Sequence, residues 1–199
     1  MRHTLRLTLT VLVTFSLHIR ANVLTPLEEA GNFQYLAPLT VQPLIIAQDA
    51  IRLGRVDQAE ALLESFLADN EANKSNAAAW ELLGIVSALR GNAKASIIAF
   101  DTAIKLAPDA PVPIVRAGIV EWSQGRLKQA ESRFTSALNL SPSNDFALSN
   151  LSRFYDYQSR FDDVIALLEP QQSTLSEETL YLLASALTQT GQSKKAEDT

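Results

Sequence analysis

Two stretches of the sequence carry the same residues at a fixed separation of 34 positions. One stretch runs from Trp80 to Pro108 and the other from Ile114 to Pro142. The residues that are identical across this shift form five pairs: Gly84 and Gly118, Gly91 and Gly125, Phe100 and Phe134, Ala103 and Ala137, Pro108 and Pro142. A chain with such a period is built from copies of one small unit, each of which packs mainly on its neighbours.

A short polar turn extends this periodicity beyond the two clearest copies. It occurs at 54–59, 91–96, 125–130, 159–164 and 191–196, with spacings of 37, 34, 34 and 32 residues. The three extra residues between the first two copies fall in segment 69–75, and the two missing residues fall near Pro170. Because insertions are tolerated in loops, these length changes are compatible with about five stacked units.

The repeated residue types predict two helices per unit. The glycines that open the polar turns, at positions 54, 91, 125 and 191, should end a first helix in the left-handed conformation. Gly84 and Gly118 fall inside that helix, where glycine costs about 1 kcal/mol relative to alanine. We therefore expect a second helix to approach closely there. Trp80, Phe100 and Phe134 are the expected main buried side chains between units.

These residues resemble the tetratricopeptide repeat, in which Trp, Leu and Gly are followed by a small residue, Phe, Ala and Pro. The resemblance covers roughly residues 40–199, with Ser87 and Glu121 where the family often has tyrosine. It implies an all-α, right-handed superhelical solenoid of about five antiparallel helix-turn-helix hairpins over residues 43–199. The expected repeats are 43–75, 76–109, 110–143, 144–175 and 176–199, the last incomplete, which suggests a fragment of a longer protein.

The first 21 residues have the pattern of a secretory signal peptide. Arg2, His3 and Arg6 accompany an apolar run from Leu5 to Leu17, and a small residue follows at Ala21. A run of this length is short of the roughly 20 residues that span a bilayer as a helix. An alternative cut follows Ser16, and an uncleaved inner-membrane anchor or an ordinary first helix are alternatives. We expect a bacterial periplasmic or extracellular protein, with an irregular lead-in over 22–42.

Composition excludes several classes of function. The chain has 17 basic and 22 acidic residues, a net charge of −5, which disfavours nucleic acid as a partner. It has no cysteine, and its two histidines, His3 and His18, both precede the repeats. The usual catalytic triads and most metal sites therefore cannot be built. We expect no enzyme activity, no cofactor and no small-molecule substrate.

In the tetratricopeptide family, the first helix of each hairpin lines a concave groove. The resemblance implies that the groove residues here are Gln48, Arg52, Glu81, Ile85, Arg116, Ile119, Trp122, Asn150, Arg153, Tyr157, Tyr181 and Ser185. Trp122 and Tyr157 would be aromatic anchors, and Arg52, Arg116 and Arg153 a locally basic strip. Alternatively, Trp122 packs between neighbouring helices and the arginines are solvated surface residues.

The groove predicts an unidentified protein or peptide partner, an extended or helical segment with acidic and aromatic or aliphatic character. Glu81 would repel a terminal carboxylate, which disfavours the capture of heat-shock chaperone tails that some members of the family perform. The predicted function is an exported scaffold for protein–protein interactions. Alternatives are the repeat portion of a larger cell-envelope machine that assembles or exports polysaccharide or surface proteins, an enzyme whose catalytic domain lies elsewhere, and a cytoplasmic regulator.

Overall fold

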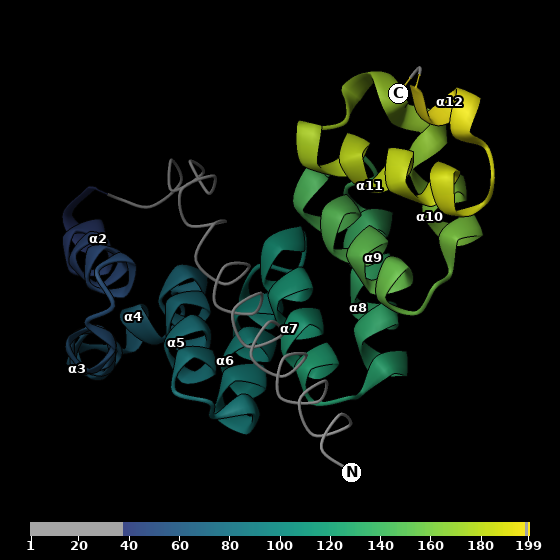
Figure 1. The fold of residues 1–199 in the computed structure, drawn as a ribbon. Helices are drawn as coiled ribbons and strands as arrows, with labels where there is room; N and C mark the ends of the chain where they lie inside the picture. The colour runs from purple at the N-terminus through teal and green to yellow at the C-terminus, as the bar shows by residue number, and fades with distance from the viewer. Residues whose placement is uncertain (1–37, 198) are drawn as a thin grey trace, which may run out of the picture.

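The computed structural model describes residues 38–197 and residue 199, and every regular element in this part of the chain is helical (Figure 1). The predicted signal peptide and most of the predicted lead-in lie outside the described residues. The elements are α2 (Pro38–Arg52), α3 (Val56–Asp69), α4 (Glu71–Lys74), α5 (Ala77–Leu89), α6 (Ala93–Leu106), α7 (Pro111–Ser123), α8 (Leu127–Leu140), α9 (Asp145–Tyr157), α10 (Phe161–Leu168), the 3₁₀ helix η2 (Glu169–Thr174), α11 (Glu177–Gln189) and α12 (Ser193–Glu197).

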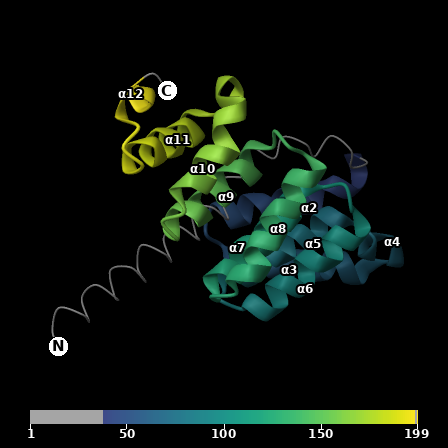
Figure 2. The ribbon, with the colours of Figure 1, turned by 90° about the vertical axis from the view of Figure 1, so that its right-hand side faces the viewer.

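Ten of these helices form five hairpins, which confirms the predicted all-α solenoid. The pairs are α2 with α3, α5 with α6, α7 with α8, α9 with α10, and α11 with α12. The first helix of each later hairpin also packs on the second helix of the hairpin before it, as in the contacts of α3 with α5 and α6 with α7. The hairpins therefore follow one another in chain order from the purple end to the yellow end (Figure 2).

The turns inside the hairpins share one backbone geometry. Gly54, Gly91, Gly125 and Gly191 have φ between +71° and +78°, as predicted, and Ser159 takes their place in the fourth hairpin with φ of +58°. The residue after each donates its backbone N–H back to the carbonyl five residues earlier, for example Arg126 N to Glu121 O at 2.9 Å. This is the Schellman arrangement that satisfies carbonyls at a helix C-terminus.

The glycines inside the first helices allow the close helix packing that the sequence predicts. A Cβ atom added at Gly84 would lie 2.6 Å from the ring of Phe100, and one added at Gly118 would lie 2.8 Å from the ring of Phe134. Both rings are fully buried. Phenylalanine on the second helix therefore fills the space that glycine leaves on the first, and the pair sets the spacing within the hairpin.

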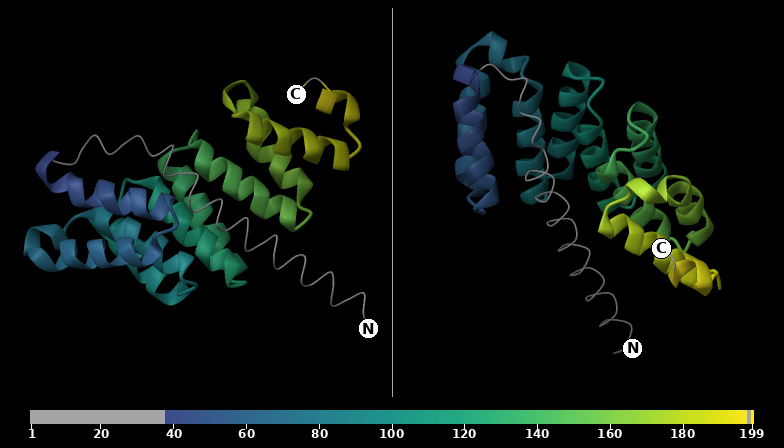
Figure 3. Two further views of the ribbon diagram at one scale, coloured as in Figure 1. Left: turned by 60° about the vertical axis from the view of Figure 1, so that its left-hand side comes forward. Right: turned by 90° about the horizontal axis from the view of Figure 1, so that it is seen from above.

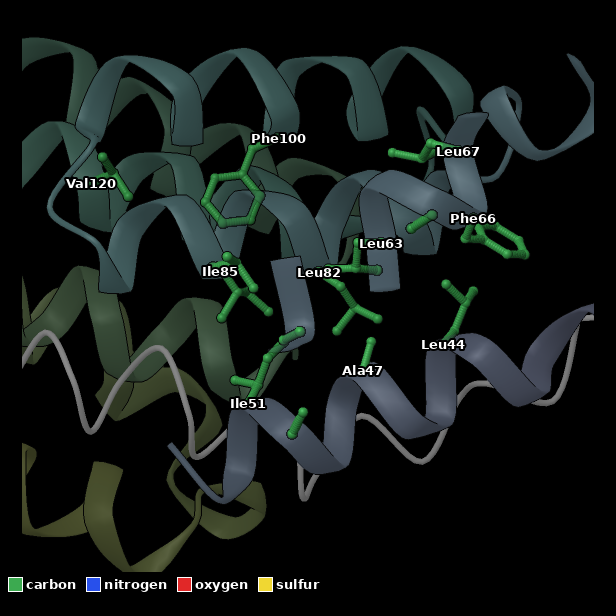
Figure 4. Packing of buried hydrophobic residues seen from close by; sticks show 14 of the residues in the cluster. Leu44, Ala47, Ile51, Leu63, Phe66, Leu67, Leu82, Ile85, Phe100 and Val120 are labelled. Carbon is green, nitrogen blue, oxygen red and sulfur yellow. The ribbon is translucent and has the colours of Figure 1, made fainter. Parts of the chain in front are cut away.

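The apolar interior follows the repeats and is divided into three clusters. In the first cluster, Leu44, Ala47 and Ile51 of α2 point toward Leu82 and Ile85 of α5 (Figure 4). The second cluster lies among α7, α8 and α9, and the third lies among α9, α10 and α11. Each hairpin thus buries its apolar residues mainly against its immediate neighbours, as the energetics of short repeats require.

The structure differs from the sequence expectation at three places. Segment 69–75, expected as a loop, contains the short helix α4, which Asn70 caps by accepting from Asn73 N at 2.9 Å. Trp80 is only partly buried, and its indole N–H donates to the Lys74 carbonyl at 2.8 Å beside this helix. Helix α2 begins at Pro38, inside the predicted lead-in, since proline is tolerated in a first helical turn.

Candidate protein-binding surface

All the predicted groove residues lie on first helices, which we call the first-helix set. Gln48 and Arg52 are on α2, Glu81 and Ile85 are on α5, Arg116, Ile119 and Trp122 are on α7, Asn150, Arg153 and Tyr157 are on α9, and Tyr181 and Ser185 are on α11. The set therefore spans the five hairpins. Its role in binding stays a prediction, and the burial and contacts of its members divide it into distinct groups.

Only part of the first-helix set is accessible. Tyr181 is 74% exposed, Tyr157 is 56% exposed, and Arg52 is also exposed. Five members are partly buried: Gln48, Glu81, Trp122, Arg153 and Ser185. The other four are at most 2% exposed: Ile85, Arg116, Ile119 and Asn150. The helical period gives the direction of a side chain but not what packs over it, so the sequence alone could not separate these groups.

Two members of the set form an ion pair between hairpins. Arg116 Nε donates to Glu81 Oε1 at 2.8 Å, with Arg116 fully buried and the Glu81 side chain 24% exposed. The guanidinium also lies over the ring of Phe146, 5.8 Å from its centroid. Burial lowers the pKa of Arg116 from its ordinary value, and the Glu81 carboxylate opposes that effect. The pair therefore connects α5 to α7 in a poorly solvated place.

The other two arginines of the predicted basic strip also have carboxylate partners. Arg153 pairs with Glu178 at the start of α11, and burial lowers the pKa of its guanidinium. Arg52 Nη2 lies 2.7 Å from Asp49 Oδ1 within α2. The expectation of a locally basic strip is therefore corrected: Arg52, Arg116 and Arg153 are each neutralised by a carboxylate of the same chain.

Trp122 belongs to an aromatic cluster at the junction of three helices. Its ring centroid lies 6.5 Å from that of Phe134, 5.5 Å from Phe154 and 5.6 Å from Tyr157, all in edge-to-face arrangements. Phe134 and Phe154 are fully buried, whereas Tyr157 is exposed. Trp122 therefore packs between neighbouring helices, which is one of the two readings its sequence position allows, and it also supports the exposed ring of Tyr157.

An open depression of about 400 Å³ is lined by Glu121, Lys128, Gln129, Ser132 and Arg133. Arg133 of this depression forms an ion pair within the chain, with its Nη1 2.8 Å from Asp101 Oδ1. Among the described residues there is no group of three side chains suited to hold a metal ion. None of the described helices is long and apolar enough to cross a bilayer.

Sequence reasoning missed the carboxylates that pair with the arginines. Glu178 lies in the first turn of α11 and pairs with Arg153, so it bridges α9 and α11. A usable signal exists for some pairs, because opposite charges about one repeat apart can meet across adjacent hairpins. Arg116 and Glu81 are 35 residues apart, and Arg90 and Asp57, which also pair, are 33 residues apart. The separation in sequence thus identifies candidate pairs.

Comparisons with known proteins agree with this fold. Residues 46–111 match the model of the tetratricopeptide repeat family. PilF of Pseudomonas aeruginosa is 16% identical with a TM-score of 0.69, covering 80% of this chain and 72% of that one. MamA, residues 41 to the end, from Desulfovibrio magneticus RS-1 is 18% identical with a TM-score of 0.61, covering 81% of this chain and 91% of that one.

A search of the curated proteins finds no significant match to the sequence. At the identities of the two solved structures, the likeness establishes the fold and nothing further. The family match begins within α2 and ends at the start of α7, so it includes the first of the two clearest sequence repeats, Trp80 to Pro108. The protein is a tetratricopeptide-like helical repeat protein.

Proposed function

We propose that the protein is an exported scaffold that binds a segment of another protein on the exposed part of the first-helix set. Stacked repeats of this kind present extended concave surfaces that suit extended or helical peptide segments. The binding centre in this proposal is the group Trp122, Tyr157 and Tyr181. The partner segment is aromatic or aliphatic in character, because the arginines of the set are already paired with carboxylates.

The exposure of two aromatic rings on consecutive first helices is the observation that carries the proposal. Tyr157 on α9 is 56% exposed and Tyr181 on α11 is 74% exposed, whereas the repeated phenylalanines Phe100 and Phe134 are fully buried. Tyrosine has an apolar ring and a polar tip, loses little conformational entropy on binding, and is enriched among residues that dominate interface energetics. Trp122 contacts the Tyr157 ring in an edge-to-face arrangement, with 5.6 Å between the ring centroids.

Export is the second part of the proposal and rests on residues 1–21. Their basic start, short apolar run and small residue at Ala21 support a cleavable signal peptide. The absence of cysteine is compatible with any compartment, so it does not decide the question. The partner would then be a protein of the cell envelope or the medium.

The binding proposal is tested by quantitative affinity capture from an envelope extract. The test variant is Tyr157→Ala combined with Tyr181→Ala, and the matched control is Ile98→Ala, which removes a 56% exposed apolar side chain from the second helix α6. Because a binding hot spot contributes about 2 kcal/mol or more, at least one captured protein should fall by over tenfold with the tyrosine variant alone. Equal capture by the wild type, the tyrosine variant and the control would refute the proposal.

A further inference from the structure

Helix α2 is apolar on two opposite sides, and only one of them is covered. The covered side packs on α3 and α5 and consists of Leu44, Ala47, Ala50 and Ile51, each at most 4% exposed. The other side carries Ile45, Ile46 and Leu53, which are 49%, 45% and 61% exposed. A helix with apolar residues all round is normally buried on all sides. The outer side of α2 therefore has the composition of an interface.

The later hairpins show what kind of structure fits on this side. When the chain is aligned by its turns at 54, 91, 125, 159 and 191, Ile46 and Asp49 correspond to residues that are at most 3% exposed in α7, α9 and α11. Those residues are Ala117 and Val120, Leu151 and Phe154, and Leu183 and Ala186. In each case the second helix of the preceding hairpin packs on the first helix that carries them. The outer side of α2 is thus shaped to receive another helix.

No described hairpin precedes α2, which forms one end of the array (Figure 3). Terminal units of a repeat array need a polar outer face to stay soluble as single chains. The outer face of α2 instead combines three exposed aliphatic side chains with one acidic and one basic residue, Asp49 and Arg52. The face therefore lacks the composition of a cap.

The two charged residues make this face complementary to itself. Arg52 Nη2 lies 2.7 Å from Asp49 Oδ1, and their side chains are 60% and 53% exposed, so both can exchange partners. In an interface with two-fold symmetry, contacts occur in pairs. If one residue contacts a second residue of the partner subunit, that second residue contacts the partner's copy of the first. Two antiparallel α2 helices centred near Asp49 would place Ile46 against Leu53 of the partner subunit. The same arrangement lets each arginine reach the aspartate across the axis.

We propose that the outer face of α2, formed by Ile45, Ile46, Asp49, Arg52 and Leu53, is a self-association surface on which a second copy of this chain packs its own α2 in the antiparallel direction. The interface is distinct from the tyrosine surface on α9 and α11. A dimer would present two copies of that surface, so its apparent affinity for a repetitive partner would rise by avidity.

The size of the contact sets the strength that we expect. A helix of 15 residues is about 22 Å long, and a pair of such helices falls at the low end of the area that specific interfaces bury. The dimer should therefore dissociate in the micromolar range. Sedimentation velocity of the full chain, over concentrations from low micromolar to near millimolar, covers this range.

Charge reversal on α2 provides the decisive experiment. Asp49→Arg places two cations on the face and Arg52→Asp places two anions, so each variant alone should self-associate at least tenfold more weakly than the wild type. A mixture of the two should form a heterodimer at least as readily as the wild type dimerises, because every cross-axis contact then joins opposite charges. Ile98→Glu, on an exposed position of α6, is the matched control and should not change association.

Cross-linking tests the same geometry independently of the strength of the dimer. The natural chain has no cysteine, so Ile46→Cys mixed with Leu53→Cys should give a disulfide-linked heterodimer, whereas a Lys94→Cys control should not. These positions are exposed, so folding should be retained, which circular dichroism can check. A monomer at every concentration overturns the proposal. Association that both charge variants retain would also overturn the proposal, and so would a mixture of the two variants that fails to restore association. In either case, the occupant of the outer face of α2 would be residues 22–37 or another protein.

Discussion

Arg116 of α7 and Glu81 of α5 form a 2.8 Å ion pair across two successive hairpins, with the guanidinium fully buried. The two residues belong to different repeats, so the pair fixes one hairpin relative to the next, beyond what apolar packing does. Arg153 of α9 and Glu178 of α11 repeat this connection further along the chain. The inner helices of the array are thus joined by charge as well as by packing.

The Glu81–Arg116 pair leads to a first prediction about stability. Glu81→Gln leaves a buried cation without its counter-charge and should lower the free energy of unfolding by about 1–3 kcal/mol. This is below the roughly 3–5 kcal/mol typical of a fully buried pair, because Glu81 keeps 24% exposure. Chemical denaturation of Glu81→Gln, Arg116→Met and the double variant measures the coupling. Strictly additive losses would show that the two side chains do not interact in solution.

The Gly118–Phe134 contact leads to a second prediction. Gly118→Ala puts a Cβ 2.8 Å from the Phe134 ring and should lower the free energy of unfolding by about 1–3 kcal/mol, despite alanine's higher helix propensity. Gly118→Ala in a Phe134→Leu background should cost less, since the clash is relieved. Gly125→Ala serves as a comparison, because its cost comes from a φ of +71° with no neighbour within 4 Å. Thermal denaturation would contradict the packing argument if Phe134→Leu gave no relief.

Tyr155 leads to a third prediction, for alkaline pH. Burial, together with Glu131, raises the pKa of Tyr155 above its ordinary value of 10.0. Because the pKa of Tyr155 is higher in the folded state than in the unfolded state, its neutral side chain stabilises the folded state below pH 10. This contribution is lost as pH rises through the folded-state pKa. The free energy of unfolding should therefore fall above pH 10, and less steeply in Tyr155→Phe. Urea denaturation at pH 8 to 11 measures the slope, and an identical slope in both proteins would exclude this role.

The aromatic cluster leads to a fourth prediction. Trp122→Ala removes edge-to-face contacts with Phe134 and Phe154 and should cost about 2–4 kcal/mol of unfolding free energy. Tyr157→Ala, at a 56% exposed position, should cost under about 1 kcal/mol. Equal losses in guanidinium denaturation would mean that Trp122 does not hold the cluster together. If they differ as expected, Trp122→Phe is the better substitution for binding studies.

A fifth prediction concerns the N-terminus. If residues 1–21 are a cleaved signal peptide, intact mass spectrometry of the protein recovered from its native compartment should find a chain that begins near Asn22, or at Leu17 if cleavage follows Ser16. Replacing Leu12 with Arg should interrupt the apolar run and leave the full-length form in the cytoplasm. Full-length protein recovered from the membrane fraction would instead indicate an uncleaved anchor.

The sequence predicted those helices and turns whose key residues can be replaced by few other residue types. Glycine at positive φ in the turn after Leu53 and glycine facing Phe100 follow from sterics, so their spacing was sufficient to place the helices. Helix α4 was missed because four residues carry no periodic signal. The burial of Ile85 and Arg116 was missed because it depends on what neighbouring hairpins place above them, which no single repeat encodes.

The high exposure of Tyr181, 74%, has a consequence for how binding would be detected. A ligand that packs on this ring binds α11 in its folded state and not in its locally unfolded state, so it stabilises the folded state of that helix. Protection of α11 amides from hydrogen exchange would therefore report occupancy even for a weak complex.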